Sequence, residues 1–207
     1  MQPGIEGLTG ASALIALGLA GVVAAQRNAV RSLTKLATVD PLSGLPNRRE
    51  LMRVLESEVA RASRGGAPFA LVLVDLDRLK SINDCCGHRA GDRAILRVAN
   101  ALRVSVRASD TAGRIGGDEF AVVLPGADIM AAHRFLHRVH GVLARHRRAG
   151  TVTVSGGIAV HPGDGATAEA LLDAADVALY ADKDRRSRRT PASIPRLSPI
   201  NMREIVR

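Results

Sequence analysis

The feature that most limits the possible folds of this 207-residue chain is a run of six apolar residues, 69–74, that ends in acids. A short apolar run without alternation is typical of a β-strand that is covered on both faces, in the middle of a sheet. Asp75 and Asp77 follow the run, and because they are two residues apart we expect them to point to the same side. A charge that emerges from a core strand is costly without a partner. The plain alternative is that each acid caps the turn after the strand.

A second acidic strand end lies at Gly116-Gly117-Asp118-Glu119, just before the apolar run 120–124. Two glycines between short β-prone runs predict a hairpin whose turn has positive φ at its centre. Adjacent carboxylates repel each other unless a cation lies between them, and Mg²⁺ takes oxygen ligands of this kind. Alone, the motif fits a solvated acidic turn equally well. Two acidic strand ends in one chain favour a metal role for Asp75, whereas Asp77 alone fits a turn cap.

Helical spacing of apolar residues and turn signals predict the remaining elements. Helices are expected at about 48–64, 91–107, 129–146 and 168–184, and a further strand at 151–160. Asn47 and Thr167 are candidate N-caps of the first and last helix. Strands that alternate with helices, with one hairpin among them, predict an α/β (α+β) sandwich of the split βαβ type.

The segment from Arg78 to Gly91 predicts a polar loop and turn beside the acidic strand end. Amide and carboxylate groups such as those of Asn83 and Asp92 can hydrogen-bond a purine edge, and Lys80 can neutralise a phosphate. Asn and Asp before a glycine are also ordinary turn residues, so both interpretations stay open.

Charge and composition narrow the possible partners. The formal net charge is +9, yet the chain has no Trp, one Tyr and three Phe. Nucleic-acid binders combine basic patches with aromatic stacking platforms, so no nucleic-acid partner is expected. Phosphate-containing ligands and anionic lipids remain as possible partners of this basic chain. Cys85 and Cys86 are adjacent, lack the spacing of a metal site, and are interpreted as small fillers in a reducing compartment.

The N-terminal segment predicts a membrane anchor. Residues 7–26 carry no charge, and about 20 such residues in a helix span roughly 30 Å, one hydrocarbon thickness. Arg27, Arg31 and Lys35 follow, which favours a cytoplasmic side for the rest of the chain. A cleaved signal peptide and a buried helix are the alternatives. We therefore expect a single-pass anchor at 1–26 in the cytoplasmic (inner) membrane, a helical stalk at 27–38 and a disordered basic tail at 187–207.

Four separated motifs, in order, resemble the GGDEF family of diguanylate cyclases across about residues 39–184. Asp40–Arg48 is similar to D-x-L-T-x-L-x-N-R, and Asp75–Asp92 to D-x-D-x-F-K-x-x-N-D-x-x-G-H-x-x-G-D. Gly116–Phe120 matches the signature itself, and Ala175–Lys183 is similar to A-D-x-A-L-Y-x-A-K. The resemblance implies that residues 39–186 form a catalytic domain with a ferredoxin-like, nucleotidyl-cyclase palm, in which helices flank a mostly antiparallel central sheet.

The resemblance also implies a reaction in which two GTP molecules, one on each subunit of a homodimer, condense to cyclic di-GMP and pyrophosphate. Attack of a 3′-hydroxyl on an α-phosphorus needs in-line placement and charge neutralisation more than covalent help. By position, Asp75, Asp118 and Glu119 would bind Mg²⁺, or Mn²⁺ in its place, with Asp118 and Glu119 as the catalytic residues. The other residues carried over by position are Asn83 and Asp92 for guanine, Lys80 and Lys183 for phosphates, and Arg107, Asp110 and Arg138 for an inhibitory product site.

Some positions depart from the family pattern. Leu79 stands where Phe is usual, and Gly156 replaces an aliphatic residue. The expected phosphate-binding Arg is Ser187, for which Arg186 or Arg188 could substitute. These departures leave a second hypothesis, a catalytically weak module that binds GTP or cyclic di-GMP as a receptor.

Overall fold

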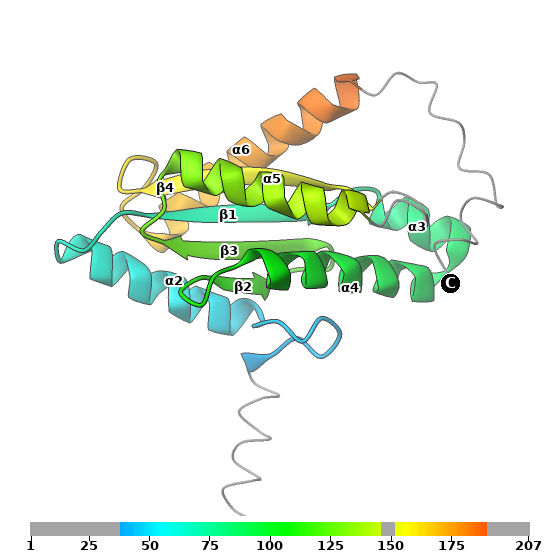
Figure 1. Cartoon of the computed structure of the whole chain (residues 1–207), viewed down its shortest axis with the longest axis horizontal. Coiled ribbons are helices and arrows are strands. Elements are labelled where there is room, and N and C mark those ends of the chain that lie inside the picture. Colours follow the sequence, from blue (N-terminus) through cyan, green and yellow to red (C-terminus); the bar gives the residue numbers. More distant parts are fainter. Residues whose placement is uncertain (1–37, 146–151, 190–207) are drawn as a thin grey trace, which may run out of the picture. The chain divides into compact units, whose positions relative to one another are not determined.

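A computed structural model of the chain describes residues 38–145 and 152–189, and its elements belong to one compact unit that begins at Val39. Strands and helices alternate around one hairpin, which confirms the predicted fold class (Figure 1). The elements are α2 (Arg48–Ser63), β1 (Phe69–Leu76), α3 (Leu79–Cys86), α4 (His88–Ser105), β2 (Thr111–Arg114), β3 (Glu119–Pro125), α5 (Ile129–Arg145), β4 (Val154–His161) and α6 (Ala168–Arg189).

Strand β1 lies inside a four-stranded sheet with the order β2-β3-β1-β4, and all three strand pairs are antiparallel. All eight residues of β1 are buried, as its continuous apolar sequence predicts. Its register places Asp75 opposite Glu119 of β3 and Ser155 of β4. Because side chains alternate along a strand, a slip by one residue would move every β1 side chain to the other face.

Two pairs of helices cover the sheet, α4 and α5 on one face and α2 and α6 on the other (Figure 1). Val72 and Val74 of β1 belong to the apolar cluster that includes α4 and α5. Leu71 and Leu73 belong to the cluster that includes α2 and α6. Asp75 shares the odd-numbered face, so its carboxylate is directed to the side of the sheet that α6 covers.

Local sequence signals set the helix ends largely as predicted. Asn47 Oδ1 accepts a hydrogen bond from the Glu50 amide at 3.1 Å, and Thr167 Oγ1 accepts one from the Ala170 amide at 3.1 Å. Each bond satisfies an amide that the first helical turn leaves without a partner. Helix α6 extends to Arg189, beyond the expected end near Asp184, so residues 187–189 are helical where a disordered tail was expected.

The segment after β1 differs from its prediction, because a helix, α3, forms where a polar loop was expected. Leu79, Ile82 and Cys86 recur at helical spacing and pack against the core on the α4 side. The polar residues Lys80 and Asn83 lie between these apolar positions, so the sequence suited a loop equally well. Helix α4 accordingly begins at His88 rather than near Gly91.

Two glycines let α5 and α6 pack closely on β4. A Cβ atom on Gly157 would collide with the Ala175 carbonyl oxygen and the Leu179 amide of α6. A Cβ atom on Gly156 would collide with Leu136 of α5, on the other face. The glycine that replaces the usual aliphatic residue is therefore accommodated by a larger neighbour.

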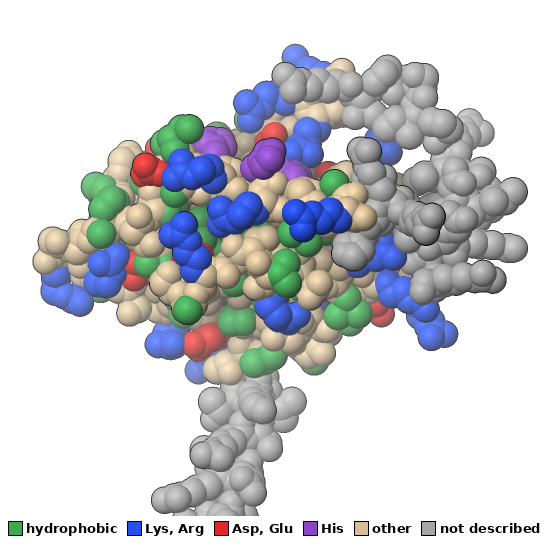
Figure 2. Space-filling view, in the orientation of Figure 1, with side chains coloured by type: hydrophobic (Ala, Val, Ile, Leu, Met, Phe, Trp, Pro, Cys, Tyr) green, Lys and Arg blue, Asp and Glu red, His purple; other side chains and the backbone are tan. Residues whose placement is uncertain are grey.

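Basic side chains gather on the face that α4 and α5 present to solvent (Figure 2). His133, Arg134, His137 and Arg138 of α5 are exposed. None of the helices in the described part of the chain is long and apolar enough to cross a membrane. The predicted anchor and stalk, apart from Thr38, and residues 190–207 of the tail lie outside the described residues.

Candidate active site

Acids from distant parts of the chain meet at one end of the two central strands. Asp75, near the end of β1, lies directly opposite Glu119, the first residue of β3. Directly opposed residues of antiparallel strands share a face, with Cβ atoms about 4.5–5.5 Å apart. The Leu76 amide donates to the Asp118 carbonyl oxygen at 3.0 Å, which holds the hairpin against β1. The structure thus brings together the three acids that the sequence singled out.

Asp75 is buried, and its Oδ2 atom lies 2.9 Å from the Lys183 ammonium of α6. Burial raises the pKa of the Asp75 carboxyl above its usual range, and the charges of Asp118 and Asp77 add to this, although Lys183 opposes it. Burial lowers the pKa of Lys183, but Asp75 outweighs that effect and the pKa is raised. Lys183, predicted to hold phosphate, here supplies the positive charge that this carboxylate needs.

The donor set fits a hard divalent cation, because carboxylate oxygens are the ligands that Mg²⁺ prefers. Asp75 and Glu119 share a face, and Asp118 is close enough to raise the pKa of Asp75. No three His, Cys, Asp or Glu side chains within the described ranges are already arranged as a metal cluster. An ion would therefore have to draw the exposed Glu119 side chain toward Asp75, in the place that Lys183 takes here.

The hairpin turn forms as predicted, but the predicted positive φ at Gly116 and Gly117 is wrong, since neither residue has it. The turn is wider than a two-residue turn, and the Glu119 carbonyl oxygen accepts from the amides of Ile115 and Gly116 at 2.9 and 3.3 Å. A Cβ atom on Gly116 would lie 2.5 Å from Glu119 Oε2. Gly116 thus leaves room for the Glu119 carboxylate in its present position and does not adopt an unusual backbone conformation.

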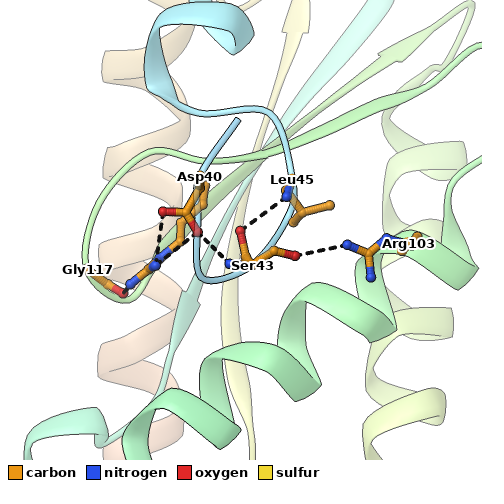
Figure 3. Close-up of polar contacts among 6 residues, drawn as sticks. Asp40, Ser43, Leu45, Arg103 and Gly117 are labelled. Carbon is orange, nitrogen blue, oxygen red and sulfur yellow. Dashed lines mark hydrogen bonds and ion pairs between the residues drawn. The ribbon is translucent and has the colours of Figure 1, made fainter. Parts of the chain in front are cut away.

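Arg114 joins this turn to the loop before α2, a link that the sequence did not reveal (Figure 3). Its NH1 atom lies 3.1 and 3.2 Å from the two carboxylate oxygens of Asp40. Its NH2 and Nε atoms donate to the Gly117 carbonyl oxygen at 2.7 and 3.3 Å. The Ser43 amide donates to Asp40 at 2.7 Å, and Arg103 of α4 donates to the Ser43 carbonyl oxygen at 2.9 Å. The loop and the acidic turn are therefore held as one unit.

Burial alone would raise the pKa of Asp40, but hydrogen bonds from Ser43 and the guanidinium of Arg114 outweigh it and hold the pKa below its usual value. Both side chains of the ion pair are mostly buried, with 13% of Arg114 and 18% of Asp40 exposed. A charge pair in such a place is screened less by solvent than a surface pair. Asp40 thus belongs to the framework of the acidic turn.

Asn83 and Asp92, the two predicted guanine ligands, come from α3 and α4, which pack against each other. A Cβ atom on Gly91 would collide with Asn83 Oδ1, so the Asn83 amide lies against the residue before Asp92. Asn83 Oδ1 is buried and has no hydrogen-bond partner among the described residues. A buried acceptor without a partner is costly, and a ligand donor would relieve that cost.

Two features fit a phosphate at the start of α3. No side chain caps this helix, so its first amides are available to an anion. The second feature is Lys80, which is exposed in the first turn.

Asp77 does not act as a turn cap, contrary to the prediction. Its carboxylate accepts hydrogen bonds from Thr153 Oγ1 at 2.6 Å and Ser155 Oγ at 2.7 Å. It thereby fastens the end of β1 to β4. The alternating polar residues of the β4 segment were the only signal for this in the sequence.

The two arginines that flank Ser187 have partners of their own. Arg186 Nε donates to Asp182 at 2.8 Å, and its NH2 atom lies 3.0 Å from His140 Nε2. Arg188 pairs with Asp184 at 3.0 Å. Burial, with the positive charge of Arg186, lowers the pKa of His140. A phosphate would have to draw either arginine away from these contacts.

The three residues predicted for a product site lie around the C-terminal end of α4. Asp110 accepts a hydrogen bond from the Arg107 amide at 2.8 Å in the turn that follows the helix. Arg138 of α5 donates to the Ser105 carbonyl oxygen at 3.3 Å, and its guanidinium lies 5.7 Å from the Phe135 ring centroid. The structure thus brings Arg138 to the same end of the domain as Arg107.

A sequence model of the family described as "Diguanylate cyclase, GGDEF domain" matches residues 37–189. The chain belongs to the GGDEF family. It is 41% identical to diguanylate cyclase DgcP of Pseudomonas aeruginosa over 71% of this chain and 22% of DgcP. It is 38% identical to the response regulator PleD of Caulobacter vibrioides over 76% of this chain and 36% of PleD. The match thus spans 22% of the length of DgcP and 36% of the length of PleD.

The fold of this GGDEF domain agrees with solved structures. The coiled coil and GGDEF domain of DgcB from Caulobacter crescentus, solved in complex with c-di-GMP, superposes with a TM-score of 0.76. The two are 30% identical, and the match covers 84% of this chain and 94% of that one. The GGDEF domain of PA1120 from Pseudomonas aeruginosa has a TM-score of 0.67 at 35% identity, over 71% and 89% of the two chains.

Proposed function

We propose that this chain is a diguanylate cyclase that condenses two GTP molecules to cyclic di-GMP with release of pyrophosphate. The observation that carries the proposal is the placement of Asp75 opposite Glu119, on one face of the sheet, with Asp118 in the adjoining turn. Family membership and relatives that bear the name diguanylate cyclase support it.

Each cluster of residues has one task in this proposal. Asp75, Asp118 and Glu119 would hold Mg²⁺, or Mn²⁺, which supplies charge neutralisation at the reacting phosphate. Asp118 would also accept the proton of the attacking 3′-hydroxyl. Lys80 and Lys183 would hold phosphates together with the first amides of α3. Asn83, whose buried Oδ1 has no partner in the described region, would accept a hydrogen bond from guanine beside Asp92.

The charge on Asp75 links ion and substrate binding. Lys183 neutralises Asp75 in this structure. With a divalent ion held by the acids, Lys183 would no longer be needed to neutralise Asp75, and its ammonium group would be available to the substrate's phosphates. Lys183 would thereby stabilise the Asp75 carboxylate before the ion and substrate bind, and the substrate afterwards.

We further propose that the enzyme acts as a homodimer, since the product contains two guanosine units and each chain has a single set of site residues. The uncharged segment 7–26, followed by Arg27 and Arg31, supports a single-pass anchor in the cytoplasmic membrane with the catalytic domain on the cytoplasmic side. No nucleic-acid partner is proposed. The proximity of Arg107, Asp110 and Arg138 supports a site at which the product inhibits.

The test is to incubate the 207-residue protein in detergent with GTP and Mg²⁺ and to measure cyclic di-GMP by mass spectrometry. Glu119→Gln keeps the size of the side chain and removes its charge, so we expect product formation to fall at least about 100-fold. Glu56→Gln, at an exposed position of α2, is the matched control and should keep the parental rate. Product from Glu119→Gln at the parental rate would contradict the proposed site.

A second candidate function is a receptor that binds GTP or cyclic di-GMP without turnover. It is favoured by Ser187 in the place of a phosphate-binding arginine and by the engagement of Arg186 with Asp182 and His140. The GTP assay separates the two, because a receptor would bind the labelled nucleotide and form no product.

A further inference from the structure

Two adjacent thiols at the end of α3 form a feature that the proposed reaction does not use. Cys85 is exposed and Cys86 is partly buried against the core on the α4 side. Their Sγ atoms are 3.4 Å apart, and the Cys86 thiol donates to Cys85 Sγ. The interpretation of these residues as fillers therefore accounts for Cys86 but not for Cys85, whose sulfur faces solvent beside a second sulfur.

The geometry does not favour a disulfide between them. Neighbouring Cα atoms across a trans peptide are about 3.8 Å apart, whereas disulfides usually join Cα atoms about 4.4–6.8 Å apart. Closing the sulfurs to about 2.05 Å would require the backbone of this helical turn to move. Burial and the neighbouring Cys85 also raise the pKa of the Cys86 thiol, which reduces the thiolate that oxidation and disulfide exchange need.

A single large thiophilic atom between the two sulfurs avoids the geometric obstacle, because it bonds to both sulfurs while they stay about as far apart as their observed 3.4 Å and the helix stays intact. Zn²⁺ does not suit the pair, since a structural zinc site needs four ligands and the described residues offer no group of three. A ligand that needs only two thiols is therefore required, and soft sulfur donors select soft elements.

We propose that Cys85 and Cys86 form a chelating site for a trivalent, thiophilic metalloid of the arsenic(III) class. In the reaction with an organic arsenoxide, two S–H bonds break and two As–S bonds form. The arsenoxide oxygen leaves with both protons as one water molecule. Arsenic remains trivalent and no oxidant is involved. The exposed Cys85 reacts first, and Cys86, already in contact with it, closes the ring.

The experiment uses the reduced 207-residue protein with one equivalent of phenylarsine oxide. These are the only two cysteines of the chain, so chelation removes the whole thiol titre with one reagent molecule per chain. Intact mass spectrometry should show one phenylarsenic adduct that survives excess glutathione and is removed by a small dithiol. Cys85→Ser and Cys86→Ser should each lose the adduct in glutathione, with at least a 100-fold faster release than the parent.

Circular dichroism of each variant shows whether it remains folded, and a double variant, Cys85→Ser with Cys86→Ser, gives the background. Release of the parental adduct by glutathione as fast as from either single variant would overturn the proposal, because the two thiols would then act separately. Binding of two phenylarsenic groups per chain with excess reagent would overturn it as well, because each thiol would then hold an arsenic atom of its own. Neither readout depends on cyclase activity, so the proposal can fail or hold independently of the proposed function.

Discussion

Arg114→Gln is expected to weaken both the stability and the activity of the domain, because Arg114 alone joins the Asp40 carboxylate to the Gly117 carbonyl oxygen. Hydrogen bonds that involve a charged group contribute roughly 1.5–3 kcal/mol each. The substitution also leaves the partly buried Asp40 carboxylate without the opposite charge of Arg114, which lowers the stability further. The two contacts together give an expected loss of about 3 kcal/mol in the free energy of unfolding. At about 2–4 °C per kcal/mol, the melting temperature should fall by roughly 6–12 °C.

The pair contribution can be isolated by a double-mutant cycle with Asp40→Asn, measured by urea denaturation. We expect a coupling free energy of about 2 kcal/mol between the two substitutions. Because the folded-state pKa of Asp40 is depressed, its contribution is present above the unfolded-state value and disappears as pH falls through the folded one. The stability difference between the parent and Asp40→Asn should therefore vanish at acid pH.

Activity offers a second measure of the same contact. Release of the turn displaces Asp118 and Glu119, and displacements of this kind lower kcat by about 10- to 100-fold while KM changes less. Arg53→Gln is the control, since Arg53 makes the same kind of paired contact with Glu50 but is exposed on α2. No measurable loss is expected there. If Arg114→Gln proved as stable and as active as Arg53→Gln, the role assigned to the Arg114 contact would be wrong.

Two further substitutions test the packing and one tests the pH dependence. Gly157→Ala should destabilise the domain by about 3 kcal/mol in urea denaturation, because its Cβ would collide with the α6 backbone. Gly141→Ala, in α5 with open space at that position, should instead stabilise it by roughly 0.5–1 kcal/mol. The lowered pKa of His140 means that the unfolded chain binds more protons, so stability should fall as pH drops below about 6.5. His140→Gln should flatten that fall, and an unchanged profile would exclude His140 as its source.

Local patterns in the sequence predicted the centre of the fold and the meeting of the acids. The continuous apolar run 69–74 indicated a buried middle strand, and the glycine pair indicated the hairpin that brings Glu119 to Asp75. Both signals are short-range, because burial on two faces shows as a continuous apolar run and a hairpin turn shows as a pair of glycines. Helix α3 was missed, since its stripe of three apolar residues is interrupted by Lys80, Asn83 and other polar side chains that suit a loop equally well.

Polar contacts between residues far apart in the chain could not be predicted from local sequence patterns. Asp40 and Arg114 are 74 positions apart, and each alone is an ordinary turn or strand-end residue. The contacts of Asp77 with Thr153 and Ser155 span 76 and 78 positions and likewise have no periodicity to reveal them. Only the fold determines which charged side chains meet, so the residues that position the acidic turn could be found only in the structure.

The central position of β1 bears on how such a site could be controlled. Both edges of this strand are hydrogen-bonded to neighbours and all of its residues are buried, so its amide hydrogens should exchange only when the whole sheet opens. Because Asp75 lies on this rigid strand, a regulatory signal could change the position of its carboxylate only slightly. In the proposed homodimer, regulation would then act on how often the two copies come face to face, and a stimulus would change the frequency of encounter rather than the chemistry within each half.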